Sequence, residues 1–393
     1  MHLNMRPTTR PNTRPTDRPA TRPATRPTAR PTTRRTARLA AVALVGAGLF
    51  QVQAAQAATA TYTLTNLGSL GYISTEGAGL DATGQATGVS SLPGTFPTTG
   101  CPPKHKPCLA HPAHAFRYSD GAITDLGTLG GEYSAGAAIN ASGTVAGYAD
   151  LASGLQHAAV FSGGTISDLG SLSGAAGVSS ATAINDAGQV AGSTTAPGIS
   201  AQEAFIESGG VMTGLGILSG GTFSTATGIN SAGAVVGIED DAASDEHGFV
   251  YSDGVRTDLG SLGGPNTAAY AINDNGLIVG TSQTASDADH VFAYSDGTMT
   301  DLGGYNIDTV PQAVNDAGVI VGQTYGVTGS GSTFLDAFIY EAGAFHDLNS
   351  LIPAGSGWQL TDATAINAAG QILVDATETG NGQTATLLLT PTG

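Results

Sequence analysis

The chain has 393 residues and a net charge of −17, but this charge is unevenly distributed. Residues 1–57 contain ten of the fourteen basic residues, all of them arginine, and a single acid. The rest of the chain has four basic residues against thirty acids, a net charge of −26. A body this acidic repels nucleic acid and anionic lipid headgroups, so it excludes nucleic-acid partners and favours cations or cationic partners.

Residues 1–38 are dominated by arginine, proline and threonine, with Arg-Pro, often followed by Thr, recurring every four residues from Arg6 to Arg30. Proline at this density, among polar and charged residues, cannot bury a hydrophobic core. The sequence therefore predicts a disordered basic segment here. The alternative, a basic arm for nucleic acid, has no support in the acidic chain that follows.

Residues 39–57 have the features of a signal peptide. Arg34, Arg35 and Arg38 precede an apolar run from Leu39 to Phe50, which is followed by Ala55-Gln56-Ala57. This order predicts cleavage after about Ala57 and export to the periplasm or the extracellular space. The apolar run is too short to span a bilayer, and no longer one follows, so we expect no membrane insertion once the signal is removed.

The chain contains two cysteines, Cys101 and Cys108. A cysteine pair in an exported chain predicts a disulfide. A zinc site with the nearby His105, His111 and His114 is the alternative, but the spacing differs from that of familiar zinc fingers.

Residues 58–393 repeat one pattern of four short elements seven times. The first element is rich in alanine and glycine and ends in Ile-Asn, as at Ala183–Asn185. The second is a Val/Ile run ending in glycine, the third contains His-Ala-Phe or a relative, and the fourth contains Asp-Leu-Gly. All four have the length of strands and are separated by glycine turns, which predicts an all-β fold.

The third element is apolar at adjacent positions, as in Ala204, Phe205 and Ile206, which indicates a strand covered on both faces. Four-stranded units that recur every 43 to 46 residues are typical of propeller blades. The repeats begin with a lone fourth element at Tyr62–Gly68 and end with a lone third element at Thr384–Thr390. We therefore predict a seven-bladed β-propeller of four-stranded blades, with the last blade closed by the N-terminal strand. A β-solenoid is the competing architecture.

The repeat resembles the extracellular repeat proteins of the HAF family. The resemblance lies in His114-Ala-Phe116, Asp125–Gly131 and Ala138-Ile-Asn140, with their later copies, and covers nearly all of residues 62–390. It implies export and a repeat fold, but it implies no particular activity.

Acidic loops between the second and third elements are the candidate metal site. Calcium prefers six to eight oxygen ligands, which clustered carboxylates can supply, although solvated polar loops on an acidic surface are the alternative. The candidate ligands are Glu239, Asp240, Asp241, Asp245, Asp287 and Asp289.

Histidine begins the third element in four repeats, at His114, His157, His247 and His290. Equivalent positions of successive blades lie too far apart to share one zinc ion, so we expect each histidine to bond a neighbouring carbonyl group. The repeated aspartates of the fourth element are expected to bond a nearby backbone or hydroxyl group. They are Asp125, Asp168, Asp258 and Asp301.

No catalytic motif is found, and no catalytic residue is predicted. Four aromatic residues, Tyr133, Phe223, Tyr270 and Trp358, are expected to line a ligand-binding face. The sequence thus predicts a secreted, monomeric binding module for a carbohydrate or protein ligand at one propeller face. The alternatives are a polysaccharide hydrolase or lyase, which acidic residues converging on the central channel would favour, and a structural cell-surface protein.

Overall fold

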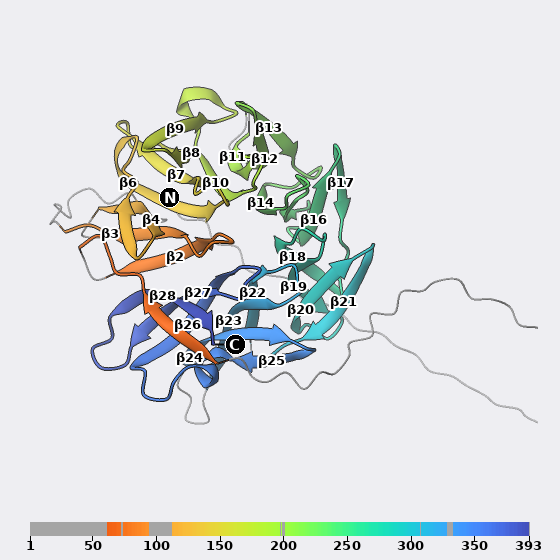
Figure 1. The fold of residues 1–393 in the computed structure, drawn as a ribbon. Coiled ribbons are helices and arrows are strands. Elements are labelled where there is room, and N and C mark those ends of the chain that lie inside the picture. The colour runs from red at the N-terminus through yellow and green to blue at the C-terminus, as the bar shows by residue number, and fades with distance from the viewer. Residues whose placement is uncertain are drawn as a thin grey trace, which may run out of the picture. The chain divides into compact units, whose positions relative to one another are not determined.

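The computed structural model describes residues 61–71, 74–93, 112–196, 198, 201–306, 308–327 and 333–392. Strands joined by tight turns make up most of these residues (Figure 1), which confirms the all-β prediction. Two short 3-10 helices are present, η1 (Gly174–Ala176) and η2 (Leu348–Leu351). Within the described ranges, no helix is long and apolar enough to cross a membrane. The expected basic segment, signal peptide and Cys101–Cys108 disulfide lie outside these ranges.

The strands of the first two repeats form one sheet of eight strands. Its two antiparallel halves, β2 to β5 and β6 to β9, are joined only by a parallel pair between Ala113 and Tyr133. The strands are β2 (Thr75–Leu80), β3 (Ala86–Ser91), β4 (Ala113–Ser119), β5 (Ala122–Asp125), β6 (Gly130–Ile139), β7 (Val145–Leu151), β8 (Gln156–Ser162) and β9 (Thr165–Gly170).

The next four repeats each form one antiparallel sheet whose four strands follow chain order. The first two of these sheets contain β10 (Ser179–Ile184), β11 (Val190–Thr195), β12 (Gln202–Ser208) and β13 (Val211–Gly216), then β14 (Ser224–Ile229), β15 (Val235–Asp240), β16 (Glu246–Ser252) and β17 (Val255–Asp258). The other two contain β18 (Gly263–Ile272), β19 (Ile278–Thr284), β20 (Asp289–Ser295) and β21 (Thr298–Gly303), then β22 (Asp308–Val314), β23 (Ile320–Val327), β24 (Thr333–Glu341) and β25 (Ala344–Asp347).

The last sheet contains both ends of the repeat region. Its strand order is β1 (Tyr62–Asn66), β28 (Thr384–Pro391), β27 (Ile372–Glu378) and β26 (Trp358–Ile366). Antiparallel pairing between β1 and β28 places Tyr62 opposite Pro391. The prediction that the N-terminal strand completes the last four-stranded unit is confirmed.

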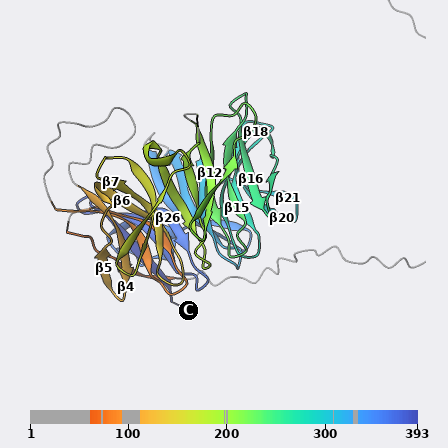
Figure 2. The same cartoon turned by 90° about the horizontal axis from the view of Figure 1, so that it is seen from above.

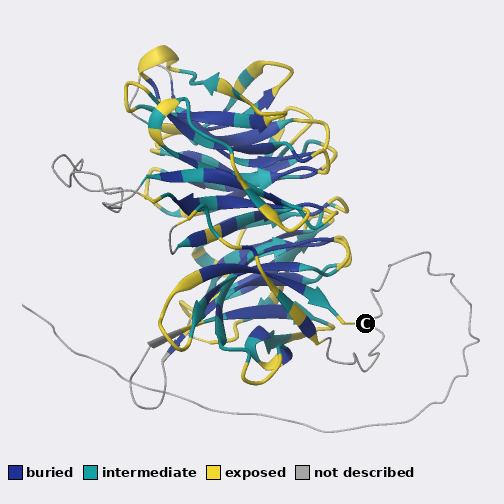
Figure 3. Ribbon diagram, turned by 60° about the vertical axis from the view of Figure 1, so that its left-hand side comes forward, coloured by how far each residue is buried: buried dark blue, intermediate teal, exposed yellow. Residues whose placement is uncertain are grey.

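Neighbouring sheets pack face against face around a common centre (Figures 1 and 2). The described residues contain seven buried hydrophobic clusters. Six of them are each shared by two successive sheets, and the seventh joins the two halves of the eight-stranded sheet. In one of them, Ala146 and Ala158 pack against Ile184 and Phe205 of the next sheet. Figure 3 shows that burial follows the strands, while the exposed residues lie mainly in turns and loops.

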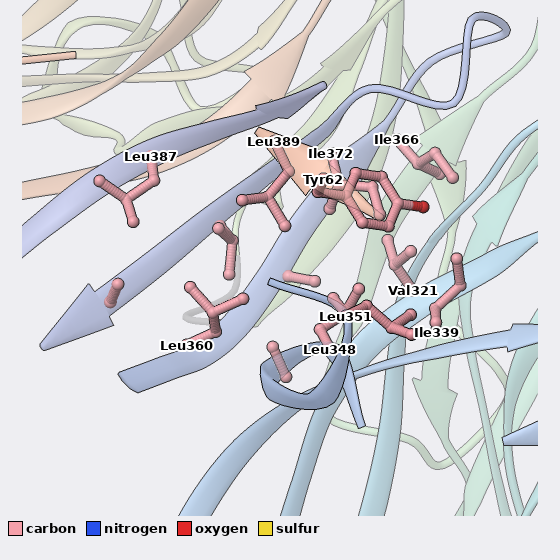
Figure 4. Close-up of a cluster of buried hydrophobic side chains, with 14 of the residues drawn as sticks. Tyr62, Val321, Ile339, Leu348, Leu351, Leu360, Ile366, Ile372, Leu387 and Leu389 are labelled. Atoms are coloured by element: carbon pink, nitrogen blue, oxygen red, sulfur yellow. The ribbon is translucent and has the colours of Figure 1, made fainter. Parts of the chain in front are cut away.

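The first and last sheets also share a cluster. Leu373 and Leu388 of the last sheet pack with Ala86 and Phe116 of the first. The cluster beside it, in which Tyr62 meets Leu389 and residues of β23 and β24, joins the last sheet to the one before it (Figure 4). Hydrophobic contact therefore runs from sheet to sheet along the chain and returns to the first.

The asparagine that follows each first strand links successive repeats. Asn140 accepts a hydrogen bond from the backbone N–H of Thr144 in its own turn, and its Nδ2 donates to the carbonyl oxygen of Asn185, 3.1 Å away. The same inter-sheet bond recurs from Asn185 to Asn230, Asn230 to Asn273, Asn273 to Asn315, Asn315 to Asn367, and Asn367 to Asp81. The series thus ends on the first repeat, where an aspartate replaces the asparagine.

Glycine in the second strand is required by a close backbone approach. The first strand has an irregularity in register opposite this position, between Ala269 and Ala271 in the fifth repeat. A Cβ atom at Gly280 would lie 1.9 Å from the carbonyl oxygen of Ala268 and 2.8 Å from the ring of the buried Phe292. No larger residue fits without displacing the first strand or the core phenylalanine.

Replacing Gly280 with alanine should therefore lower the free energy of unfolding by about 3 kcal/mol, because the added methyl group meets backbone atoms that cannot move aside. Urea denaturation would measure the change. Gly380→Ala is the control, since a Cβ atom at Gly380 meets nothing within 4 Å. Equal stabilities for the two variants would contradict this explanation.

Candidate functional site

A polar hollow of about 470 Å³ lies over β18 and β19. Asn266 and Tyr270 of β18 form one wall, and Thr281 and Gln283 of β19 form another. These side chains offer hydroxyl and amide groups, which both donate and accept hydrogen bonds, together with one aromatic ring. We call this site the acidic hollow, because carboxylates from three successive sheets also line it.

The carboxylates of the acidic hollow are Glu246 at the start of β16, Asp289 at the start of β20 and Asp308 at the start of β22. No basic residue lines the hollow. Within the described part of the chain, none of the three carboxylates makes a hydrogen bond or ion pair through its side chain. Their charge is therefore available to a ligand.

The electrostatics at Tyr270 show that these charges act on the hollow. Burial raises the pKa of the Tyr270 phenol, and the negative charges of Glu246, Asp308 and Asp289 raise it further. A hydrogen bond from Thr281 Oγ1, at 3.5 Å, opposes this rise. Tyr270 therefore stays protonated at neutral pH and can donate a hydrogen bond into the hollow.

A second hollow, of about 580 Å³, lies over β10 and β11. Its lining includes Val178, Ser180, Ser193, Gln202 and, from the turn between β7 and β8, Leu155. The Nε2 atom of Gln202 donates to Ser193 Oγ at 2.5 Å. Among the described residues, no ionisable side chain lines this site, which we call the neutral hollow.

The four aromatic residues expected to share one face are not brought together around either hollow. Only Tyr270 lines one of them. The backbone N–H of Phe223 donates to Asp240 Oδ1 at 2.8 Å, and Trp358, at the start of β26, packs against the core cluster of the last sheet. Tyr133 lies in β6, where burial and the charges of Glu132 and Asp150 raise the pKa of its phenol.

Asp240 and Asp241, two of the carboxylates expected to gather around calcium, instead make separate local contacts, whereas Asp289 lines the acidic hollow. Asp240 accepts hydrogen bonds from the backbone N–H and hydroxyl of Thr222, both at 2.6 Å. Asp241 accepts from the backbone N–H groups of Ala243 and Asp245 in its own turn. Asp287 occupies a left-handed turn position, at a φ of 61°. Among the described residues, no group of three or more histidine, cysteine, aspartate or glutamate residues is arranged to hold a metal ion.

Glu239 forms a buried ion pair. Its side chain is 3% exposed, and its Oε2 atom lies 2.8 Å from Arg256 Nη1. Burial raises the pKa of Glu239, while the Arg256 charge opposes that shift. Arg256 also donates to the carbonyl oxygen of Gly216 at 3.1 Å and lies over the ring of Phe249, so it joins two sheets. This glutamate therefore has a structural partner and is not a free metal ligand.

The repeated histidines pair with aspartates of the fourth strand, which corrects the expectation that they bond a carbonyl group. His157 Nδ1 lies 2.8 Å from Asp168 Oδ1, and the same oxygen accepts the backbone N–H of Gly170. In these four repeats the aspartate also accepts a backbone N–H of the turn that follows the fourth strand, which confirms the expected backbone bonds of the aspartates. The other pairs are His114 with Asp125, His247 with Asp258 and His290 with Asp301.

Two half-buried carboxylates that the sequence analysis missed face each other across β26 and β27. Asp362 and Asp375 are paired residues of these strands. Asp375 Oδ1 accepts from the backbone N–H of Gly77 in β2 and from Thr386 Oγ1, whereas Asp362 Oδ1 is buried without a hydrogen-bond partner. The sequence feature that could have revealed this pair is Asp375, the one acid inside the otherwise apolar stretch Ile372–Ala376 of β27.

Desolvation dominates the protonation of this pair. Burial raises the pKa of Asp362 to about 6. Burial also raises the pKa of Asp375 to about 7, with opposing hydrogen bonds from Gly77 and Thr386 and a further rise from the charges of Asp362 and Glu76. Because each carboxyl holds its proton more tightly in the folded state, ionising the pair costs folding free energy.

A family model described as a protein of unknown function, DUF3466, matches residues 260–387, less than half of the chain. No curated protein matches the sequence. Among solved structures, the chain is similar to TolB from Acinetobacter baumannii, at 12% identity and a TM-score of 0.42, over 63% of each chain. It is also similar to a mutant puromycin hydrolase complexed with PGG, at 14% identity and a TM-score of 0.46, over 79% of this chain and 53% of that one.

A third similar structure is a mutant Aleuria aurantia lectin in complex with Fucalpha1-6GlcNAc, at 15% identity and a TM-score of 0.34, over 65% of this chain and 94% of that one. The chain therefore spans less than two thirds of the length of the first two structures. Similarity at this level assigns no activity to the chain.

Replacing Asp362 with asparagine should weaken the pH dependence of stability. In the wild type, the contribution of Asp362 is favourable below its unfolded pKa of 3.8 and is lost as the pH rises through its folded pKa of about 6. The variant should lose about 3 kcal/mol less than the wild type between acidic and mildly basic pH. Denaturation across that range would measure the difference. Asp296→Asn, in an exposed turn, is the control, and an unchanged slope in Asp362→Asn would refute the assignment.

Replacing Arg256 with methionine should cost about 3 kcal/mol of unfolding free energy, since it leaves the Glu239 carboxylate buried without a counter-charge. The double variant with Glu239→Gln should recover most of that loss, as chemical denaturation would show. Arg117→Met is the matched control, because Arg117 Nη1 makes only a long hydrogen bond, of 3.4 Å, to the carbonyl oxygen of Gly143. A double variant no more stable than Arg256→Met would argue against the ion pair as the cause.

Proposed function

We propose that residues 58–393 form a closed seven-bladed β-propeller that is exported and binds polyhydroxylated ligands, of the glycan class, in polar hollows beside its strands. Three observations support the closed ring. Hydrophobic clusters join every successive pair of sheets and return to the first, β1 completes the last sheet, and the asparagine series ends on Asp81. The proposal of export rests on residues 39–57.

The binding function rests chiefly on the composition of the acidic hollow. Sugars present many hydroxyl groups that both donate and accept hydrogen bonds, together with apolar ring faces. Asn266, Thr281 and Gln283 offer complementary hydrogen-bonding groups, and Tyr270 offers an aromatic ring. The volumes of the two hollows lie within the range of about 300 to 1,000 Å³ that suits a small ligand or a few sugar residues, rather than the broad surface of a protein partner.

The second candidate function is a polysaccharide hydrolase or lyase, and the Asp362–Asp375 pair is the observation that favours it. Paired carboxyl groups whose pKa values are raised by burial are able to transfer protons near neutral pH. A turnover of polysaccharide that disappears in both Asp362→Asn and Asp375→Asn would establish this function in place of simple binding.

A glycan array probed with the purified exported chain tests the binding function. We expect at least one glycan to bind, equally well with calcium and with a chelator, because the acidic loops make local contacts instead of a shared metal site. Thr281→Ile should weaken that binding at least tenfold by filling the acidic hollow, which corresponds to about 1.4 kcal/mol.

The matched control is Val89→Ile, which enlarges the equivalent residue of β3. The two positions are equivalent because Val89 pairs with Glu76 as Thr281 pairs with Ala268. The acidic hollow would be rejected as a glycan site if no glycan bound either with calcium or with a chelator. It would also be rejected if Thr281→Ile and Val89→Ile lost binding equally.

A further inference from the structure

The acidic and neutral hollows occupy the same place in two different repeats. Thr281 pairs with Ala268 across β18 and β19, and Ser193 pairs with Ser180 across β10 and β11. Each pair lies one step beyond the glycine of the second strand, towards the loop that leads to the third strand. The preceding repeat adds its own turn between second and third strands in both cases, through Ser244 and Leu155.

Side-chain size at one position of the second strand distinguishes these two sheets from three others in the series. The position held by Ser193 and Thr281 is held by Tyr148 in β7, Ile238 in β15 and Gln323 in β23. The sheet that stands between the two hollows in sequence is the one with Ile238. A small residue at this position leaves space beside the first strand, whereas a large one occupies it.

The two hollows differ sharply in charge. Three carboxylates, Glu246, Asp289 and Asp308, face the acidic hollow, and no lysine or arginine lines it. No ionisable group lines the neutral hollow, where Ser180, Ser193 and Gln202 supply only hydrogen bonds. Because the binding position is the same, the charge of the lining becomes the main difference between the two sites.

We propose that the two hollows are a pair of repeat-equivalent sites that divide glycans by charge, the acidic hollow taking a sugar that carries a protonated amine and the neutral hollow taking an uncharged sugar. This inference rests on the proposed binding function. A protonated amine replaces the water around three unpaired carboxylates with a counter-charge, and a neutral sugar in that hollow gains no such interaction. One chain is thus able to hold two segments of a polymer whose residues differ in charge.

Titration calorimetry with two oligosaccharides tests the division by charge. The probes are the tetramer of glucosamine, at about pH 6 where its amines are protonated, and the tetramer of N-acetylglucosamine. Binding of the glucosamine tetramer should fall at least tenfold in Thr281→Ile and remain unchanged in Ser193→Ile. Binding of the N-acetylated tetramer should show the reverse pattern. Isoleucine is chosen because the fold accepts it at the equivalent Ile238.

Variants that remove charge without adding volume test whether the carboxylates themselves recognise the amine, which the isoleucine variants cannot show. Glu246→Gln combined with Asp289→Asn should weaken the glucosamine tetramer at least tenfold, and raised salt should weaken it in the wild type. The N-acetylated tetramer should be insensitive to both changes. Asp253→Asn combined with Asp296→Asn is the control, since it removes the same charge from two turns between third and fourth strands, where asparagine tolerates the left-handed backbone.

If one isoleucine variant, Thr281→Ile or Ser193→Ile, lost binding of both tetramers, the division by charge would be overturned while glycan binding would stand. Insensitivity of the glucosamine tetramer to salt and to the charge variants would overturn it as well. Absence of binding by both tetramers also overturns it, and the glycan array then decides separately whether the binding function stands.

Discussion

Each four-stranded sheet has two apolar faces, and it can bury them only against neighbouring sheets. Phe116, Phe205, Phe249, Phe292 and Phe338 are fully buried in this way, one in the third strand of each of five repeats. A single sheet of this size is not independently stable, so the repeats fold as a series in which each completes the core of the next. The glycine of the second strand follows from the same constraint, because backbone and aromatic ring meet there with no room for a Cβ atom.

Sequence periodicity was sufficient to predict the strands, their order and the pairing of β1 with β28. These features depend on the spacing of apolar residues, on the turn glycines and on the incomplete repeats at the two ends of the repeat region. All three can be read directly from the sequence. The hollows could not be predicted in this way. They depend on serine or threonine standing at one position of the second strand while neighbouring sheets have Tyr148 or Ile238, a contrast that becomes visible only when the registers are aligned.

The candidate metal residues show why residue type alone misleads. Asp240 and Asp241 lie in an acidic run, yet each carboxylate accepts hydrogen bonds from nearby backbone N–H groups. Such short-range bonds require little chain ordering and satisfy donors that would otherwise be unpaired. The three carboxylates of the acidic hollow, Glu246, Asp289 and Asp308, come from three separate sheets, and their proximity is a consequence of the fold. Only Asp289 was among the expected ligands.

The residues that link successive sheets and the residues that line the hollows lie at opposite ends of the first and second strands. The asparagine series lies at the turns between first and second strands, where Asn230 and Asn273 connect successive sheets. Both hollows lie at the opposite ends of those same strands, beside Thr281 and Ser193. Residues at the hollow end can therefore change size or charge without breaking the bonds between sheets. A repeat scaffold of this kind is able to acquire, lose or recharge a site through a few substitutions in neighbouring repeats, as the three carboxylates of the acidic hollow, each from a different sheet, illustrate.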